Sequence, residues 1–440
     1  MTRSLRDFVP LTENVVNMYV CGPTVYNYIH IGNARSAVAF DTIRRYFEYC
    51  GYTVNYISNF TDVDDKIIKA ANEAGISTKE LSDKFIAAFM EDTAQLGIKP
   101  ATQNPRVINY MDEIIAFVST LVDKGFAYVS EGDVYFRVAK SNNYAKLANK
   151  TLEDLEIGAS GRTDAETERK ENPLDFALWK AAKEGEVSWD SPWGPGRPGW
   201  HIECSVMATE ILGDTIDIHG GGADLEFPHH TNEIAQSEAK TGKTFANYWM
   251  HNGFVNVDNE KMSKSLGNFV TVHDMLKTVD GQVLRFFLAT QQYRKPINFT
   301  EKAIHDAEVN LKYLKNTHSL PLTDQVNQDE LQTYLDAFQE AMDDDFNTAN
   351  GVTVLFDMAK WINSGNYDQT VKDAFEKMLQ VFGIVFEEEV LDEDIEKLIE
   401  ERQAARANKD FATADRIRDE LAAQGIKLLD TKEGVRWTRD

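Results

Sequence analysis

This sequence has few cysteines and no long apolar run. Its 440 residues include only 3 cysteines, Cys21, Cys50 and Cys204, too few for a disulfide framework. No apolar stretch approaches the roughly 20 residues that a membrane-spanning helix needs. A basic start followed by an apolar run, which would indicate secretion, is also missing. These absences predict a cytoplasmic protein with no membrane partner.

Positive charge is in short supply as well. The chain has 46 Lys and Arg against 71 Asp and Glu, for a formal net charge of −25. Because a phosphate backbone attracts Lys and Arg, this balance disfavours nucleic-acid binding over the whole surface. The deficit is uneven: residues 387–400 hold eight acidic side chains and one lysine, whereas residues 401–440 hold nine basic and eight acidic ones. An RNA-binding surface must therefore be a local patch.

The first sixty residues alternate between strand-like and helix-like patterns. Residues 15–21 and 53–60 are strand-like, and residues 34–49 place apolar side chains at helical spacing. A strand, a helix and a second strand in this order predict a β-α-β unit and hence a parallel sheet. Cys50 ends the apolar face of the helix and is expected in the core.

The rest of the chain shows an insertion and then a run of helices. Residues 79–125 are helical and residues 133–139 strand-like, and the Pro- and Gly-rich residues 191–200 indicate the return from an insertion. Amphipathic helices dominate from about residue 301. Helices at 395–408 and 411–424 precede a possible hairpin. The prediction is an α/β fold: a Rossmann-like parallel-sheet catalytic domain with an inserted subdomain, then a helical bundle and a small C-terminal α+β module.

The tetrapeptide His30-Ile31-Gly32-Asn33 opens the first predicted helix. A helix N-terminus offers free N–H groups and a partial positive charge, which suit a polyphosphate. Gly32 permits close approach of a ligand, and His30 could donate to a phosphate oxygen as charge builds up. An ordinary strand-to-helix turn with a solvated histidine is the better interpretation of the tetrapeptide alone.

A second basic segment, Lys261-Met262-Ser263-Lys264-Ser265, follows a turn-prone stretch. Two lysines and two hydroxyls on a loop could clamp a triphosphate during in-line attack. A solvated basic loop explains the pentapeptide equally well by itself. The combination with His30, ahead of a β-α-β unit, favours a nucleotide site.

Four scattered side chains could hold a metal ion. Cys21 ends the first predicted strand, and both Cys21 and Cys204 are expected where strands meet the catalytic face. His229 and Glu233 are four residues apart and share one face of a helix. Two thiolates, an imidazole and a carboxylate suit zinc, although the spacing is not that of a zinc finger. Two structural cysteines and a surface His-Glu pair are the commoner alternative, residue by residue.

Several further segments carry a resemblance to a known family. They are residues 18–26 (MYVCGPTVY), 61–68 (TDVDDKII), 199–205 (GWHIECS), 217–225 (DIHGGGADL), 227–230 (FPHH) and 342–348 (MDDDFNT). With the two basic segments, which resemble the paired ATP-binding signatures of class I aminoacyl-tRNA synthetases, they make the whole chain similar to the cysteinyl-tRNA synthetases. One departure is Asn33, where the family motif usually has a second histidine. An amide there can donate a hydrogen bond but cannot carry charge.

The resemblance implies a reaction, its partners and its cofactors. L-cysteine and ATP would form cysteinyl-adenylate and pyrophosphate, and cysteine would then pass to the 3′ end of tRNA(Cys). One Zn²⁺ per chain would bind the substrate thiolate and so reject serine without editing. Mg²⁺ is expected with ATP, and the chain is expected to be a monomer.

The resemblance also assigns roles to residues and regions. The expected zinc ligands are Cys21, Cys204, His229 and Glu233, and the residues expected to bind ATP are His30, Gly32, Asn33, Asp224 and Lys264. The amino-acid pocket is expected to be lined by Gly22, Thr24, Thr61 and Trp200. The expected catalytic residues are His30, Lys261 and Lys264. The expected domains are 1–119 and 196–250 (Rossmann-like catalytic), 120–195 (inserted connective subdomain), 251–310 (stem contact), 311–390 (tRNA-binding helical bundle) and 391–440 (anticodon-binding module). The role of residues 343–345 is left open.

Two alternatives remain. A cysteine ligase could pass the same adenylate to an amino sugar, but such an enzyme would not require the C-terminal helices. Those helices carry cationic side chains that could face RNA: Arg402, Arg406, Lys409, Arg416 and Arg418. An inactive RNA-binding relative would not need His30, the two lysines and all four metal ligands.

Overall fold

The computed structural model describes residues 4–142, 144–151, 167–262, 268–324, 326–386, 393–431 and 434–439. The chain divides into two compact units, Met1–Val385 and Phe386–Asp440. None of the helices within the described ranges has both the length and the apolar content needed to cross a bilayer.

The first unit contains a parallel sheet of four strands in the order β2-β1-β7-β8. The strands are β1 (Val15–Val20), β2 (Thr53–Ser58), β7 (Ile216–Gly222) and β8 (Ala246–Asn252). Val15 pairs with Thr53, Met18 with Ile218 and Ile216 with Ala246, all in parallel register. The parallel sheet predicted from the β-α-β pattern is therefore confirmed.

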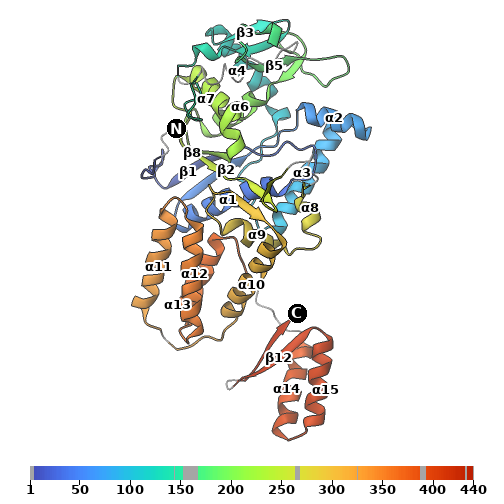
Figure 1. Ribbon diagram of the computed structural model, residues 1–440, viewed down its shortest axis with the longest axis vertical. Helices are drawn as coiled ribbons and strands as arrows, with labels where there is room; N and C mark the ends of the chain where they lie inside the picture. The colour runs from blue at the N-terminus through green and yellow to red at the C-terminus, as the bar shows by residue number, and fades with distance from the viewer. Residues whose placement is uncertain are drawn as a thin grey trace. The chain divides into compact units, whose positions relative to one another are not determined.

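Helices cover both faces of this sheet (Figure 1). Alternate residues of β1, among them Met18, pack in one cluster with Phe40 of α1 (Ile31–Tyr49). Tyr19 points to the opposite face, where its cluster includes Val118 of α4 (Met111–Asp123) and Val206 of α6 (Trp200–Leu212). Period-2 alternation in a buried strand produces these two cores. With both faces covered, the carboxyl ends of the strands form the crevice where α/β proteins bind ligands.

The insertion forms an antiparallel sheet of order β3-β4-β5-β6. Its strands are β3 (Ala127–Ser130), β4 (Asp133–Phe136), β5 (Phe176–Ala181) and β6 (Gly196–Pro198). Residues 196–198, which the expected boundary at 195/196 assigned to the catalytic domain, thus form a strand of the inserted sheet, and Trp200 begins α6. A Cβ on Gly199 would lie 2.1 Å from the carbonyl oxygen of Ala177, so the close packing requires glycine there.

Further elements of the first unit surround the sheet and form the helical bundle. They are α2 (Asp65–Ala74), α3 (Thr78–Gln95), α7 (Thr231–Thr241), β9 (Val255–Val257), β10 (Glu260–Lys261), α8 (Val272–Met275), α9 (Gly281–Ala289), β11 (Ile297–Phe299), α10 (Glu301–His318), α11 (Gln328–Asp343), α12 (Thr348–Asn363) and α13 (Gln369–Val381). Strands β9 to β11 form a small sheet of order β10-β9-β11. Position 310, expected as a domain boundary, falls inside α10.

The second unit pairs two helices with a hairpin. Helices α14 (Glu393–Ala407) and α15 (Phe411–Ala423) precede the antiparallel strands β12 (Ile426–Thr431) and β13 (Gly434–Arg439). Its small core includes Ile399, Ile417 and Leu421. The expected hairpin is confirmed.

Helix α1 begins at Ile31 with His30 as its N-cap, so the expected helix start at residues 30–33 is confirmed, and a loop of residues 21–30 separates it from β1. Three local expectations were wrong. The helical pattern of residues 79–125 is interrupted between α3 and α4. Cys50 is exposed rather than in the core, because it lies beyond the last turn of α1. Arg402 is only 6 % exposed, so it faces the interior of the second unit rather than a surface open to RNA.

Candidate active site and metal centre

Four side chains converge at the carboxyl edge of the parallel sheet. Cys21 follows β1, Cys204 lies on α6, His229 lies in the turn Glu226–His230, and Glu233 lies on α7. One donor atom from each lies within 4.8 Å of the others. The Sγ of Cys21 is 3.5 Å from both the Sγ of Cys204 and the Oε1 of Glu233. The Nε2 of His229 is 3.1 Å from that Oε1. Bonds of roughly 2.0–2.3 Å to a tetrahedral zinc place ligand atoms about 3.3–3.8 Å apart, so the donor set fits zinc in chemistry and in spacing.

The charges of these side chains also suit a cation. A hydrogen bond from the Cys21 thiol lowers the pKa of Cys204 to about 6, whereas burial raises the pKa of Cys21 well above its usual value. Burial opposes charge on Glu233, but His219 and His229 lower the pKa of this carboxyl to about 2. Burial also opposes charge on His229, but Glu233 and Cys204 raise its pKa to about 10. A divalent cation would therefore replace protons on Cys21 and His229.

Two histidines that sequence reasoning missed, His219 and His201, contact two of the candidate metal ligands. The Nε2 of His219, on β7, is 2.7 Å from the Oε2 of Glu233, and both side chains are fully buried. The Nδ1 of His201 is 3.0 Å from the Nδ1 of His229. Such partners fix the orientation of a ligand and tune its basicity. The signal for His219 was in the sequence, because it is a histidine near the carboxyl end of a buried strand.

A second group of donors overlaps the first. Cys21, His219, His230 and Glu233 also bring one donor atom each within 4.8 Å of one another. The Nε2 of His230 is 3.4 Å from the Sγ of Cys21, and its Nδ1 is 2.8 Å from the Nε2 of His251. Because the two groups share Cys21 and Glu233, they describe a single centre with additional histidines around it.

Three of the four residues expected to bind the amino acid lie in loops that follow β1 and β2. The Thr61 hydroxyl accepts from the Asn59 amide and donates to the Oε2 of Glu203, both at 3.2 Å. Thr24 forms a parallel bridge with Thr61. The N–H of Gly22 donates to the Oδ1 of Asn59 at 3.0 Å, and a Cβ on Gly22 would lie 1.7 Å from the carbonyl oxygen of Asn59. Only glycine fits this close approach of the two loops.

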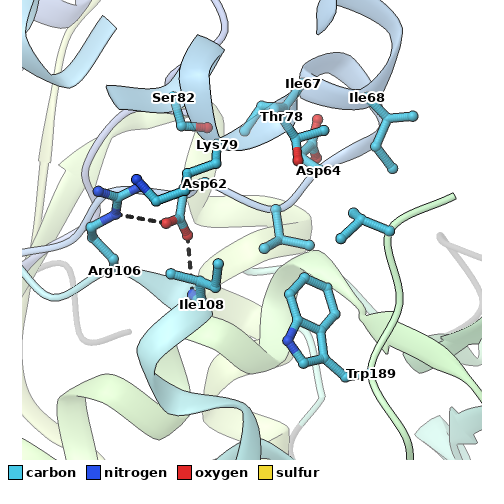
Figure 2. Close-up of a pocket in the computed structure, with 12 residues that line it drawn as sticks. Asp62, Asp64, Ile67, Ile68, Thr78, Lys79, Ser82, Arg106, Ile108 and Trp189 are labelled. Atoms are coloured by element: carbon cyan, nitrogen blue, oxygen red, sulfur yellow. Dashed lines mark hydrogen bonds and ion pairs between the residues drawn. The ribbon is translucent and has the colours of Figure 1, made fainter. Parts of the chain in front are cut away.

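Asp62 anchors the turn that carries Thr61 (Figure 2). Its buried carboxylate accepts from the Nε of Arg106 at 2.8 Å and from the N–H of Ile108 at 3.1 Å. Trp189 of the inserted subdomain lines part of the pocket beside it. These contacts hold Thr61 against Glu203, the neighbour of Cys204.

Trp200 lies beside the cluster of candidate metal ligands, and Asp224 lies directly after β7. Trp200 begins α6; its ring centroid is 4.3 Å from that of His229, and 42 % of the residue is exposed. The indole therefore covers one side of a candidate ligand while remaining accessible. Asp224 is exposed on the short turn Ala223–Leu225, directly after β7.

His30 and Asn33 cap helix α1 reciprocally. The Nδ1 of His30 accepts from the N–H of Asn33, and the Oδ1 of Asn33 accepts from the N–H of His30, each at 3.2 Å. Because Nδ1 is an acceptor, a neutral His30 carries its proton on Nε2. The amide of Asn33 therefore completes the cap.

The segment around Lys261 lies beside this helix start. The N–H of Ile31 donates to the carbonyl of Val270 at 3.2 Å, and the N–H of Val272 donates to that of Ile29 at 2.9 Å. The terminal methyl of Met262 lies 3.7 Å from the position of a Cβ on Gly32. Lys261 ends β10, whereas Lys264 lies outside the residues that the structure describes. Two segments more than two hundred residues apart thus meet at one helix N-terminus.

Comparison with known proteins gives consistent matches along the chain. The family model described as "tRNA synthetases class I (C) catalytic domain" matches residues 7–309. The DALR domain matches residues 337–387, and the "Cysteinyl-tRNA ligase anticodon binding domain" matches residues 388–437. The Cysteine--tRNA ligase of Streptococcus thermophilus (strain CNRZ 1066) is 95% identical over 440 residues, 100% of this chain and 98% of that protein. That of Streptococcus agalactiae serotype III (strain NEM316) is 82% identical over the same spans.

A solved structure supports the same fold. Mycobacterium tuberculosis methionyl-tRNA synthetase in complex with methionyl-adenylate aligns with a TM-score of 0.61 at 15% identity, covering 84% of this chain and 89% of that one. The fold and the matched catalytic domain are those of a class I aminoacyl-tRNA synthetase. Among these enzymes, the chain belongs to the cysteine–tRNA ligase family. The expected family is confirmed, and no match supports a ligase with an amino-sugar acceptor.

Proposed function

We propose that this chain joins L-cysteine to tRNA(Cys) in two steps, as its family does. The cysteine carboxylate attacks the α-phosphate of ATP, which releases pyrophosphate and forms cysteinyl-adenylate. The terminal ribose hydroxyl of the tRNA then takes the cysteinyl group, and AMP leaves. The observation that carries this proposal is the cluster of Cys21, Cys204, His229 and Glu233 at the carboxyl edge of the sheet. Both steps depend on positioning and charge stabilisation rather than on a covalent protein nucleophile.

The four clustered side chains would hold one Zn²⁺. Zinc, when bound, favours a soft thiolate ligand over the hydroxyl of serine. This chemistry addresses the hardest task of the enzyme, because cysteine and serine differ by a single atom and pocket shape alone discriminates poorly. Gly22, Thr24, Thr61 and Trp200 would line the rest of the amino-acid pocket. The network of Asn59 and Glu203 around Thr61 would hold that hydroxyl in one orientation.

The start of α1 would bind the triphosphate. His30, Gly32 and the partial positive charge of the helix N-terminus would lie against the phosphates. Asn33 maintains this geometry through the cap. Lys261 and Lys264 would stabilise the charge that develops on the phosphates, with Mg²⁺ accompanying ATP, and Asp224 would lie near the nucleoside. The pairing of Ile31 with Val270 supports a joint site for both segments.

The remaining regions would bind tRNA. We assign stem contact to residues 251–310, further tRNA contact to the bundle of residues 311–390 and anticodon contact to residues 391–440. Arg406, Lys409, Arg416 and Arg418 are exposed in the second unit and are candidate phosphate contacts. The protein would act as a monomer in the cytoplasm.

Metal analysis combined with pyrophosphate exchange tests this proposal. Purified protein should contain one zinc per chain and catalyse cysteine-dependent exchange of labelled pyrophosphate into ATP without tRNA. Cys204→Ser should lose zinc and the preference for cysteine over serine. Cys50→Ser is the matched control, because Cys50 is exposed and lies outside the cluster. A zinc-free wild type that still discriminated cysteine from serine would overturn the proposal.

A further inference from the structure

The loop between α11 and α12 contains three consecutive aspartates. Asp343 accepts from the hydroxyl of Tyr46, on α1, at 2.6 Å. Asp345 accepts from the Nε and Nη2 of Arg294 at 2.5 and 2.8 Å, and from the hydroxyl of Tyr293 at 2.9 Å. A bidentate pair of this kind fixes orientation as well as distance. Two of the three carboxylates therefore tie the helical bundle to the catalytic part of the chain.

The backbone of this loop is held in an unfavourable conformation. Asp345 and Phe346 have φ values of 54° and 52°, in the left-handed region that residues other than glycine rarely occupy. Such a conformation persists only where its surroundings over-determine it. Here the ion pair with Arg294 holds one residue, and the ring of Phe346 packs 5.4 Å from that of Phe47 on α1. The loop is thus shaped to reach the catalytic part.

The partners of Asp345 are connected to both halves of the proposed active site. The buried Arg35 on α1, one turn beyond the N-cap His30, donates through Nη2 to the carbonyl of Gln292 at 3.0 Å. The carbonyl of Tyr293 accepts from the N–H of Gly253, just after β8, at 2.7 Å. The segment of residues 292–294, which contacts Asp345, therefore also contacts α1, the proposed phosphate-binding helix, and the end of β8 near the candidate metal centre.

The contact between α1 and the loop that joins α11 to α12 is not tightly packed throughout. A small pocket between α1 and the loop is lined in part by Arg35, Tyr293, Phe346 and Thr348. Within the described part of the chain, the buried Nε of Arg35 and Oγ1 of Thr348 have no hydrogen-bond partner. The polar links of Asp343 and Asp345 therefore add to the ring contact of Phe346 with Phe47 in setting the alignment.

We propose that Asp345 is a positioning residue for the transfer of cysteine to tRNA. Through Arg294 and Tyr293 it would keep the bundle aligned with the start of α1 and the end of β8. This inference rests on the proposed contact between the bundle and tRNA. Adenylate formation needs only the catalytic part, whereas transfer also needs the tRNA to be presented correctly. Loosening the link should therefore slow transfer selectively.

The test compares Asp345→Asn with Asp344→Asn. Among the described residues, the exposed Asp344 side chain has no partner in a hydrogen bond or ion pair, so its replacement is the matched control. For Asp345→Asn we expect kcat for tRNA charging to fall about tenfold, while cysteine-dependent pyrophosphate exchange and the KM for cysteine change less than about twofold. An equal loss of both activities, or charging as fast as in Asp344→Asn, would overturn the proposal.

A double-mutant cycle with Arg294→Gln isolates the ion pair. If the pair acts as a unit, the double variant should charge tRNA no more slowly than either single variant. Losses that multiply would show two independent roles and contradict the link. The wild type separates this inference from the proposed function. If the wild type neither exchanges pyrophosphate nor charges tRNA, the proposed function itself is wrong. If the wild type does both and the variants show no selective loss of charging, only the positioning role is wrong.

Discussion

The Glu233 carboxylate is held by a histidine at each of its two oxygen atoms. His229 contacts Oε1 at 3.1 Å and His219 contacts Oε2 at 2.7 Å. The ring of His219 also stacks on that of Trp249, with centroids 4.6 Å apart. The structure therefore separates a side chain that would bind zinc from one that would orient the ligand.

Replacing His219 by Phe tests this separation, because Phe keeps an aromatic ring beside Trp249 and removes both ring nitrogens. We expect zinc affinity to fall about 10- to 100-fold, the usual effect of losing a partner that orients a ligand. Competition with a chromophoric chelator measures it. His305→Phe serves as the control, since that side chain is 71% exposed on α10. Unchanged affinity in His219→Phe would mean that Glu233 needs no such support.

The pKa values of the ligands predict how zinc binding depends on pH. At pH 7 to 8, Cys204 (pKa about 6) and Glu233 (about 2) have already lost their protons. Cys21, whose pKa is raised, and His229, with a pKa of about 10, still carry theirs. Zinc must displace both, so its affinity should rise about 100-fold per pH unit in this window. Titration calorimetry in buffers of different ionisation enthalpy counts the protons; release of none would contradict these assignments.

The first turn of helix α1 contains both a helix cap and the residues proposed to bind phosphate. The cap made by His30 and Asn33 satisfies two backbone N–H groups. In the proposed site, Asn33 would act on the helix through this cap, and His30 would contact the phosphates. This division of roles would explain how an amide can stand where the family usually has a second histidine.

Two substitutions at Asn33 separate these roles. Asn33→Ala removes the acceptor for the His30 N–H and should lower the free energy of unfolding by about 1 kcal/mol. Asn33→Asp keeps the acceptor and suits the helix N-terminus, so stability should be retained. Its added negative charge should nevertheless slow pyrophosphate exchange about tenfold by repelling the triphosphate. Chemical denaturation and exchange assays measure the two effects. Normal exchange in Asn33→Asp would place the phosphates elsewhere.

Periodicity predicted the regular elements well but not the contacts between distant ones. The alternation in β1 and the helical spacing after residue 34 were sufficient for the parallel sheet, because burial on two faces leaves a clear pattern. The strand β6 was missed, since three residues rich in Gly and Pro carry no strand signal. His201 and His219 were missed for another reason: their roles arise from partners 28 and 14 residues away that only the fold brings near.

The two units of the chain would divide the proposed reaction between them. All the candidate metal ligands and both proposed phosphate-binding segments belong to Met1–Val385, whereas the anticodon-binding family model matches residues in the second unit. A chain ending at Val385 should therefore retain cysteine-dependent exchange within about twofold. Its kcat/KM for tRNA(Cys) should fall on the order of 100-fold, or about 3 kcal/mol of lost binding. Equal loss of exchange and charging would argue against this division.

The net charge of −25 is compatible with tRNA binding only if cations are gathered locally. Four basic residues of the second unit are exposed and could contribute to such a patch, whereas the buried Arg402 could not. The acidic surplus elsewhere would discourage non-specific RNA contacts.

X-ray absorption at the zinc edge tests the central claim most directly. Two sulfur ligands should surround the ion in the free enzyme, supplied by Cys21 and Cys204. Addition of L-cysteine should raise the number to three, and L-serine should leave it at two. A sulfur count that stays at two in the presence of saturating cysteine would contradict recognition of the substrate by the metal.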